Sequence, residues 1–196
     1  MKCGTGMPCE SANELHALYH AEVATEVVQF RVQPYTLRFV IGGSVRSYTP
    51  DLEETLANGQ IRVTEIKDKF EADGDPDYAE KLHYTAAFCR AKGQIFRVLE
   101  RAEIETKPLF DSVDIIQGFR RTAVTVDDVM RLNERFAGRS AIGLAEAREI
   151  FSSAPLGFAK LAAMMVRRII AIDLDKQLSA ETPVRVLNRI CQQAAA

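Results

Sequence analysis

The sequence predicts an α/β protein in which helices flank a mixed β-sheet, followed by a smaller, mostly helical domain. Residues 11–104 read as a helix, three antiparallel strands, a helix and a further strand. After Lys107-Pro108 the pattern becomes mainly helical. Two strands with a helix between them imply a mixed sheet covered by helices. We therefore expect two domains, residues 1–105 and 106–196.

The composition excludes several classes of protein. It is 47% hydrophobic and 27% charged, as in ordinary globular proteins. No run of 18 or more apolar residues occurs, and the first residues lack the apolar core of a secretory signal, so we expect a cytoplasmic protein without membrane spans. The net charge is −4 over residues 1–104 and +2 over residues 105–196, which is not the balance of a strongly basic nucleic-acid binder. Any contact with DNA therefore needs a local patch or a partner.

The first helix is predicted over residues 11–28, SANELHALYHAEVATEVV. Ser11 is a candidate N-cap, and Glu14 follows at the spacing of a capping box. Leu15, Leu18 and Val23 supply part of an apolar stripe with helical periodicity. Glu14 therefore has a structural interpretation, as a cap of its own helix.

Residues 27–41 are rich in β-branched and aromatic side chains and are interrupted by Pro34, which predicts two strands. Gly42-Gly43 marks a tight hairpin turn. Residues 45–56 are predicted to form the returning strand.

Asn58-Gly59 predicts the next hairpin turn. The strand after it, residues 61–70, alternates between apolar and polar side chains, and the alternation slips at Glu65. A place where the local pattern fails is where a functional residue is expected. An acidic loop, a helix over residues 77–93 and a strand over residues 94–104 complete the first domain.

The second domain is predicted to contain helices followed by a β-hairpin. Three helices followed by a hairpin are the outline of a winged helix-turn-helix, and the last three expected helices precede the hairpin. The expected helices cover residues 112–119, 125–138, 143–153 and 157–168, and the hairpin covers residues 169–190.

Asp51, Glu65 and Lys67 form the main candidate site. Glu65 and Lys67 are two positions apart on a strand, so they share a face. The Asn58-Gly59 hairpin brings Asp51 beside them. Two ionised carboxylates repel each other without a cation, and Mg²⁺ prefers oxygen ligands and retains waters. The alternatives are a turn residue for Asp51 and a surface pair for Glu65 and Lys67.

Pro50-Asp51 and Glu65-Ile66-Lys67 match the pattern PD-(D/E)-x-K, and the chain resembles the restriction-endonuclease-like superfamily of nucleases. Over residues 10–105 it resembles more closely the TnsA transposon-end endonucleases. The shared motifs occur in order: Ser11 with Glu14, Val27 to Phe30 with Gln33-Pro34, Tyr48 to Asp51, and Glu65 with Lys67. That family also has a helical, winged-helix-like C-terminal domain.

The resemblance implies roles for individual residues. Asp51, Glu65 and the carbonyl of Ile66 would bind Mg²⁺, for which Mn²⁺ would substitute. Lys67 would act on the nucleophilic water, and Glu14 would complete the acidic set. A further residue, Gln33, would lie near the site in a supporting or DNA-facing role, although a polar residue before a proline turn is an equally ordinary interpretation.

In the second domain, Lys160, Arg167 and Arg168 are predicted to be available to DNA phosphates, which attract cationic side chains whatever the base sequence. The alternative is that they are solvated charges on a protein-interaction domain. The resemblance implies double-stranded DNA, a transposase and a regulator ATPase as partners, and it allows a homodimer.

Three functions follow from these residues. The first is an Mg²⁺-dependent endonuclease subunit of a transposition system that hydrolyses phosphodiester bonds at transposon ends. The second is a stand-alone nuclease of the same superfamily from restriction, phage or repair contexts. The third is a non-catalytic DNA-binding adaptor, against which the intact Asp51, Glu65 and Lys67 argue.

Overall fold

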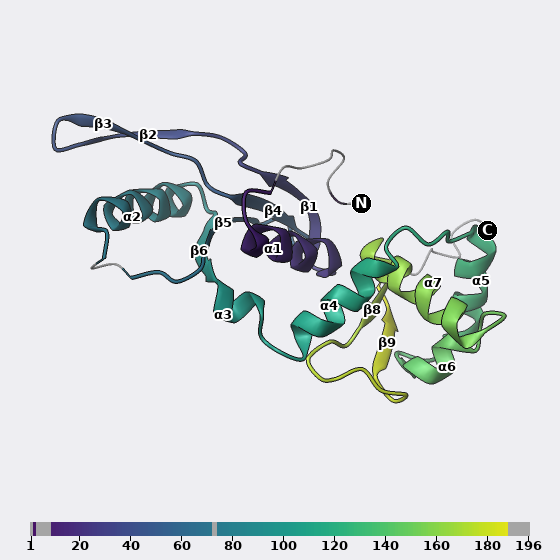
Figure 1. Cartoon of the computed structure of the whole chain (residues 1–196). Coiled ribbons are helices and arrows are strands. Elements are labelled where there is room, and N and C mark those ends of the chain that lie inside the picture. Colours follow the sequence, from purple (N-terminus) through teal and green to yellow (C-terminus); the bar gives the residue numbers. More distant parts are fainter. Residues whose placement is uncertain (1, 3–8, 72–73, 188–196) are drawn as a thin grey trace, which may run out of the picture. The chain divides into compact units, whose positions relative to one another are not determined.

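The computed structural model describes residues 2, 9–71 and 74–187 and divides the chain into two compact units, residues 2–106 and 107–196. The first unit contains α1 (Ala12–Val23), β1 (Val27–Val32), β2 (Leu37–Ile41), β3 (Ser44–Tyr48), β4 (Leu52–Leu56), β5 (Ile61–Lys67), α2 (Pro76–Ala91), β6 (Ile95–Glu100) and α3 (Arg101–Ile104) (Figure 1).

The centre of the first unit is a four-stranded mixed sheet in the order β1-β4-β5-β6. β4 pairs antiparallel with β1 and β5, whereas β6 pairs parallel with β5. The parallel pair is possible because α2 carries the chain back between β5 and β6. The predicted α/β class, with a mixed sheet and several helices, is confirmed.

Helices α1 and α2 cover opposite faces of this sheet. Ile66 of β5 belongs to the apolar core beside α1, whereas its neighbour Glu65 contacts Tyr78 of α2. Successive side chains of a strand point to opposite faces, so the two helices lie on opposite sides of β5. The core on the α1 face consists of Ala17, Leu18, Ala21, Val27, Phe30, Leu52, Leu56, Ile66 and Ile104.

The predicted strand over residues 45–56 is two strands. β3 ends at Tyr48 and β4 begins at Leu52. Pro50, between them, has no N–H to donate to a strand partner. The break separates the chain into a two-stranded hairpin, β2–β3, and the four-stranded sheet.

The last strand of the first unit is also shorter than predicted. β6 ends at Glu100, and residues 101–104 form α3. Glu100 and Glu103 make the reciprocal bonds of a capping box, which starts this helix.

The second unit contains α4 (Leu109–Gly118), α5 (Val126–Arg135), β7 (Ile142–Gly143), α6 (Leu144–Arg148), α7 (Ala154–Val166), β8 (Ile170–Ile172) and β9 (Pro183–Val186). Its antiparallel sheet has the order β7-β9-β8.

Several predicted elements of the second unit are present. Thr125 caps α5 through a capping box with Asp128, and β8 pairs with β9 as the expected hairpin. The helix expected over residues 143–153 is shorter, because α6 ends at Arg148. Residues 188–190 of the predicted hairpin lie outside the described residues.

Within the described ranges, every helix is too short or too polar to cross a lipid bilayer.

Candidate active site

The strand register brings Asp51 beside Glu65. β4 and β5 pair with Leu52 opposite Thr64, so Asp51 lies one step beyond the last pair, level with Glu65. The Oδ2 atom of Asp51 accepts a hydrogen bond from the N–H of Ile66, at 2.7 Å. The carboxylate therefore occupies the place of a ladder acceptor at the end of the β4–β5 pair.

Glu65 and Lys67 project side by side, as their spacing predicts. The distance from Lys67 Nζ to Glu65 Oε1 is 3.1 Å. The ammonium group also lies over the ring of Tyr78, 4.3 Å from its centroid. Lys67 is partly exposed, whereas Glu65 is only 4% exposed.

Two tyrosine hydroxyls hold the buried carboxylate of Glu65. Tyr48, at the end of β3, donates to Oε2, and Tyr78, in the first turn of α2, donates to Oε1. Burial, together with Glu65 itself, raises the pKa of both tyrosines far above the ordinary value. Both hydroxyls therefore remain protonated and donate to Glu65, which fixes its orientation.

Sequence reasoning did not single out Tyr78. Its position follows from a local signal, because Asp75 accepts the backbone N–H of Tyr78 as the N-cap of α2 and Pro76 occupies the first turn. That signal fixes where the helix begins. The contact with Glu65 depends on the packing of α2 against the sheet, which a local pattern does not reveal.

Asp51 lies in an unfavourable electrostatic environment. Its pKa is raised to about 7 by burial and by the nearby carboxylates of Glu65 and Glu14, although the Ile66 N–H and Lys67 oppose the shift. The negative charges at this end of the sheet are therefore only partly compensated by protein groups, as is common in sites that receive a cation.

The side chain of Glu14 makes the contacts of a helix cap. It accepts the Ser11 hydroxyl at 3.1 Å and the backbone N–H of Glu10 at 3.0 Å. The Ser11 Oγ in turn accepts the N–H of Glu14, at 3.1 Å. Ser11 therefore caps α1 as expected, whereas the backbone N–H that Glu14 accepts is that of Glu10. The negative charge of Glu14 also contributes to the raised pKa of Asp51.

Gln33 borders the site through its main chain. Its φ angle is 45°, in the left-handed region, and its N–H donates to the carbonyl of Asp51 at 2.9 Å. Its side chain points toward Glu10, with an Nε2 to Oε1 distance of 3.4 Å. Gln33 thus holds the backbone that carries Asp51.

The described residues include no group of three or more His, Cys, Asp or Glu side chains that could hold a metal ion. The donor set at the end of the sheet is smaller, with the two carboxylates of Asp51 and Glu65. Mg²⁺ is commonly bound by one or two carboxylates, with water in its remaining positions. The raised pKa of Asp51 beside a second buried carboxylate fits such a cation.

The cations predicted to contact phosphate in the second unit lie in different surroundings. Lys160 forms an ion pair with the buried Asp128, and it lies 5.4 Å from the centroid of the Phe151 ring. Its ammonium group is therefore already engaged within the unit. Helix α7, which carries Lys160, is buried from Leu161 to Val166 and so presents little surface to a groove.

The two arginines after α7 differ from each other. Arg167 is exposed and donates to the carbonyl of Thr122 at 2.9 Å. Arg168 is partly buried and has a φ angle of 58° at the end of the helix.

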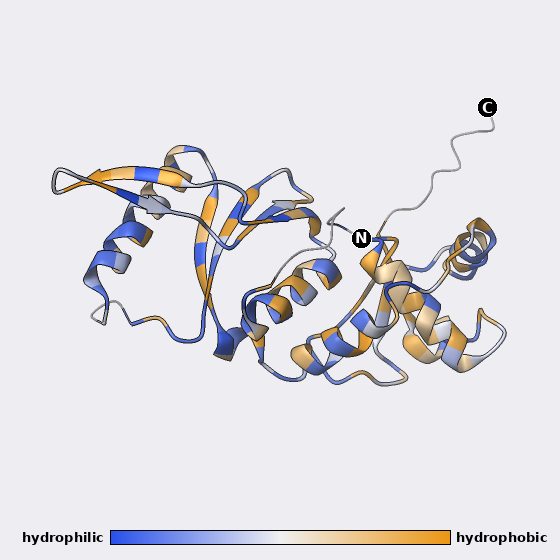
Figure 2. Cartoon of the chain, turned by 45° about the horizontal axis from the view of Figure 1, so that its top comes forward, coloured by the Kyte–Doolittle hydropathy of each residue, from blue (hydrophilic) through white to orange (hydrophobic). Residues whose placement is uncertain are grey.

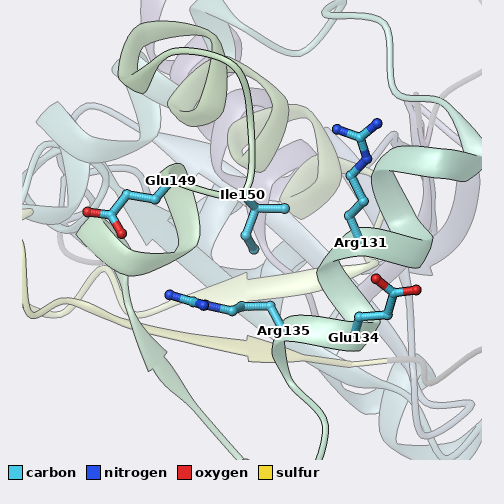
Figure 3. Close-up of a pocket in the computed structure, with 5 residues that line it drawn as sticks. All are labelled: Arg131, Glu134, Arg135, Glu149 and Ile150. Atoms are coloured by element: carbon cyan, nitrogen blue, oxygen red, sulfur yellow. The ribbon is translucent and has the colours of Figure 1, made fainter.

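The second unit also contains a cavity of about 520 Å³. Figure 3 shows its lining residues, Arg131, Glu134, Arg135, Glu149 and Ile150. Arg135 pairs with Glu146 at 3.0 Å and Arg131 with Asp127 at 2.8 Å, so the cationic lining is already neutralised. None of the predicted site residues lines this cavity.

No protein-family model matches the chain, and the search of curated proteins finds no match.

Proposed function

We propose that the protein is an Mg²⁺-dependent DNA endonuclease of the PD-(D/E)-x-K type, and that it serves a transposition system by hydrolysing phosphodiester bonds at transposon ends. The observation that carries the proposal is the convergence of Asp51, Glu65 and Lys67 at one end of the β4–β5 pair. Two acidic side chains and an amine that lie together near the surface are suited to the hydrolysis of a phosphodiester.

The sheet supports a restriction-endonuclease-like fold. A helix precedes the sheet, an antiparallel hairpin joins the strands that carry the two acids, and a helix crosses from β5 to the parallel β6. The resemblance to TnsA endonucleases implies this same order around the motifs.

Asp51, Glu65 and the Ile66 carbonyl are the groups that would hold Mg²⁺. When bound there, this ion would lower the pKa of a coordinated water and offset the charge that develops on the phosphate. Tyr48 and Tyr78 keep Glu65 in a fixed orientation for this task. Each carboxylate oxygen has a second lone pair, so these hydrogen bonds leave Glu65 able to serve as a ligand.

Lys67 is suited to orient the attacking water through its ammonium protons and to steady the phosphate. Its Nζ atom lies between the Glu65 carboxylate and the Tyr78 ring, and it is partly exposed at the surface where a phosphate would arrive. Glu14 would contribute negative charge at the site from the first turn of α1, in addition to its capping role.

The second unit is proposed to be a winged-helix-like domain that contacts DNA or a partner protein. The order of α5, β7, α6, α7 and the β8–β9 hairpin supports this proposal. Arg167 and Arg168 remain the proposed phosphate contacts. A transposase and a regulator ATPase are the proposed partners, since the resemblance to TnsA endonucleases implies them.

The test is a plasmid-nicking assay with Mg²⁺ or Mn²⁺ and with EDTA. Asp51→Ala and Lys67→Ala should each reduce the rate at least a hundredfold. The exposed residues Asp114 and Lys92 provide controls of the same charge, and Asp114→Ala and Lys92→Ala should leave the rate unchanged.

Nicking that survives Asp51→Ala and Lys67→Ala would reject the site. A properly folded protein that binds DNA without any metal-dependent nicking, alone or with a transposase, would favour the adaptor function. Full activity on ordinary plasmid without a partner would favour a stand-alone nuclease.

A further inference from the structure

We propose that the β2–β3 hairpin is a DNA-gripping arm that enters the major groove of the duplex beside the cleaved phosphate. This inference rests on the proposed nuclease function. It assigns a binding surface to a segment that lies outside the four-stranded sheet and extends over α2 (Figure 1).

The charge of the segment is opposite to that of its surroundings. The hairpin, residues 37–48, contains two arginines, Arg38 and Arg46, and no carboxylate. Residues 1–104 as a whole carry a net charge of −4. The hairpin is therefore a basic exception in an acidic unit, and it complements a polyanion.

One face of the hairpin contacts α2. Phe39 lies against Tyr84 of α2, with ring centroids 5.7 Å apart, and Arg46 forms an ion pair with Asp77 at 3.1 Å. Phe39 and Arg46 are cross-strand partners, so they share this face. These contacts hold the hairpin against α2 and give it a defined orientation.

The other face is exposed. It carries two cross-strand pairs, Arg38 with Ser47 and Val40 with Val45. Val40 is 73% and Val45 is 69% exposed, and together they form an apolar tip. Figure 2 shows in orange the hydrophobic stretch of the hairpin near its turn. The tip is narrow because Gly42 and Gly43 turn the chain with φ angles of 55° and 80°.

A two-stranded ribbon of this kind fits the major groove of B-form DNA. Apolar side chains at its tip can contact thymine methyl groups there, while an arginine farther along the same face meets phosphate. Without a partner, Val40 and Val45 remain in water and lose the favourable free energy that burial of their apolar surface would supply.

The hairpin is continuous with the candidate site. Tyr48, the last residue of β3, donates a hydrogen bond to Glu65. From Ser44 to Tyr48, β3 reaches roughly 13 Å, at about 3.3 Å per residue. DNA rises about 3.4 Å per base pair, so the tip is expected to touch bases about four pairs from the cleaved bond.

The experiment measures binding of the full-length protein to a 40-base-pair duplex by fluorescence anisotropy in EDTA, over a range of salt concentrations. Arg38→Ala should weaken binding and lower the slope of log affinity against log salt by about one. Val40→Ser combined with Val45→Ser should weaken binding about tenfold with the slope unchanged. A duplex with uracil in place of thymine should weaken the wild type and leave the valine variant unaffected.

Matched controls exist for both changes. Arg90 is an exposed arginine on α2, and Val126, on α5, is 76% exposed. Arg90→Ala and Val126→Ser should bind as the wild type does. Because all the substituted side chains are exposed, folding should be retained, and thermal unfolding of each variant checks this.

The nicking assay on the same samples separates this inference from the proposed function. Nicking that depends on Asp51, with unchanged DNA affinity in the Arg38 and valine variants, would overturn the inference and leave the function standing. Loss of affinity in these variants, without any metal-dependent nicking, would support the DNA-gripping arm and contradict the proposed nuclease function. If the valine variant changes the concentration dependence of the oligomeric mass and not the DNA affinity, the tip joins two copies of the chain, and the inference fails.

Discussion

The buried carboxylate of Glu65 shows how single residues determine the free-energy cost of burying charge at this site. A buried charge is expensive unless hydrogen bonds and a counter-charge satisfy it. Glu65 receives two tyrosine hydroxyls and the ammonium of Lys67, whereas Asp51 receives a single backbone N–H and stands near two other carboxylates. The two acids are therefore held very differently, although one β-hairpin carries both.

Tyr78→Phe should lower the free energy of unfolding by about 1–3 kcal/mol, because it removes a donor from a buried carboxylate. The control is Tyr84→Phe, since Tyr84 lies on the same helix and is 40% exposed. Urea denaturation of both variants measures the difference. Equal stabilities of the two variants would contradict the role assigned to the Tyr78 hydroxyl.

Asp51→Asn should stabilise the protein at high pH and not at low pH. The pKa of Asp51 is raised from 3.8 to about 7 in the folded protein, so the folded state binds more protons than the unfolded state between these values. The stability contributed by this group therefore falls as the pH rises from about 4 to 7. Asparagine carries no charge and avoids this loss.

We expect the Asn variant to gain on the order of 1–2 kcal/mol at pH 8, a value reduced for the partial exposure of Asp51, and to match the wild type below pH 4. Urea denaturation at the two pH values measures this gain, with Asp114→Asn as the exposed control. An equal effect at both pH values would show that Asp51 is not held in the environment described.

At the scale of the elements, close packing of α6 and α7 depends on a glycine. A Cβ atom at Gly157 would lie 2.3 Å from the carbonyl oxygen of Arg148, which is backbone and cannot move aside cheaply. Gly157→Ala should therefore destabilise the protein by about 1–3 kcal/mol or more.

Gly118, at the end of α4, is the matched control for this prediction. A Cβ atom there meets nothing within 4 Å, so Gly118→Ala should be neutral or stabilise the helix by up to about 1 kcal/mol. Thermal unfolding of both variants tests the contrast. A similar effect of the two substitutions would mean that α6 and α7 do not approach each other so closely.

The turns and the N-caps of α1 and α5 were the features that the sequence predicted best, because their signals are local. Gly42-Gly43 and the Asn58-Gly59 turn occur where they were expected, and Thr125 caps α5. Strand partners were harder to predict. β1 pairs with β4 across the intervening β2–β3 hairpin, and the sequence of neither strand indicates which strand it pairs with.

The contacts of the candidate site also include local ones, which the sequence predicts, and long-range ones, which it does not. The juxtaposition of Glu65 with Lys67, and of both with Asp51, follows from strand spacing and one turn. The contacts of Tyr78 and of Lys160 do not, because each depends on a helix packing against residues far away in the sequence. Lys160 is 32 residues from its partner Asp128, so no local pattern could show that this lysine is engaged.

At the scale of the whole molecule, the first unit holds its own core and its own candidate site. All the core residues on the α1 face lie between Ala17 and Ile104. The proposed catalytic residues, the tyrosines that orient Glu65 and the arm formed by β2 and β3 also lie within residues 2–106. Folding and the electrostatics of Asp51 should therefore not require the second unit.

A chain of residues 1–106 should accordingly unfold cooperatively, and it should reproduce the pH-dependent effect of Asp51→Asn found in the full-length protein. A domain of this size buries enough surface to fold alone, as many shorter ones do. Circular dichroism melts at pH 4 and pH 8, with and without the substitution, measure both properties. In the full chain, Gly157→Ala should lower the stability of the second unit and leave the Asp51→Asn effect unchanged, since side chains in separate cores act additively. A non-cooperative melt of residues 1–106, or a strong coupling between the two substitutions, would show that the two units share one folding transition.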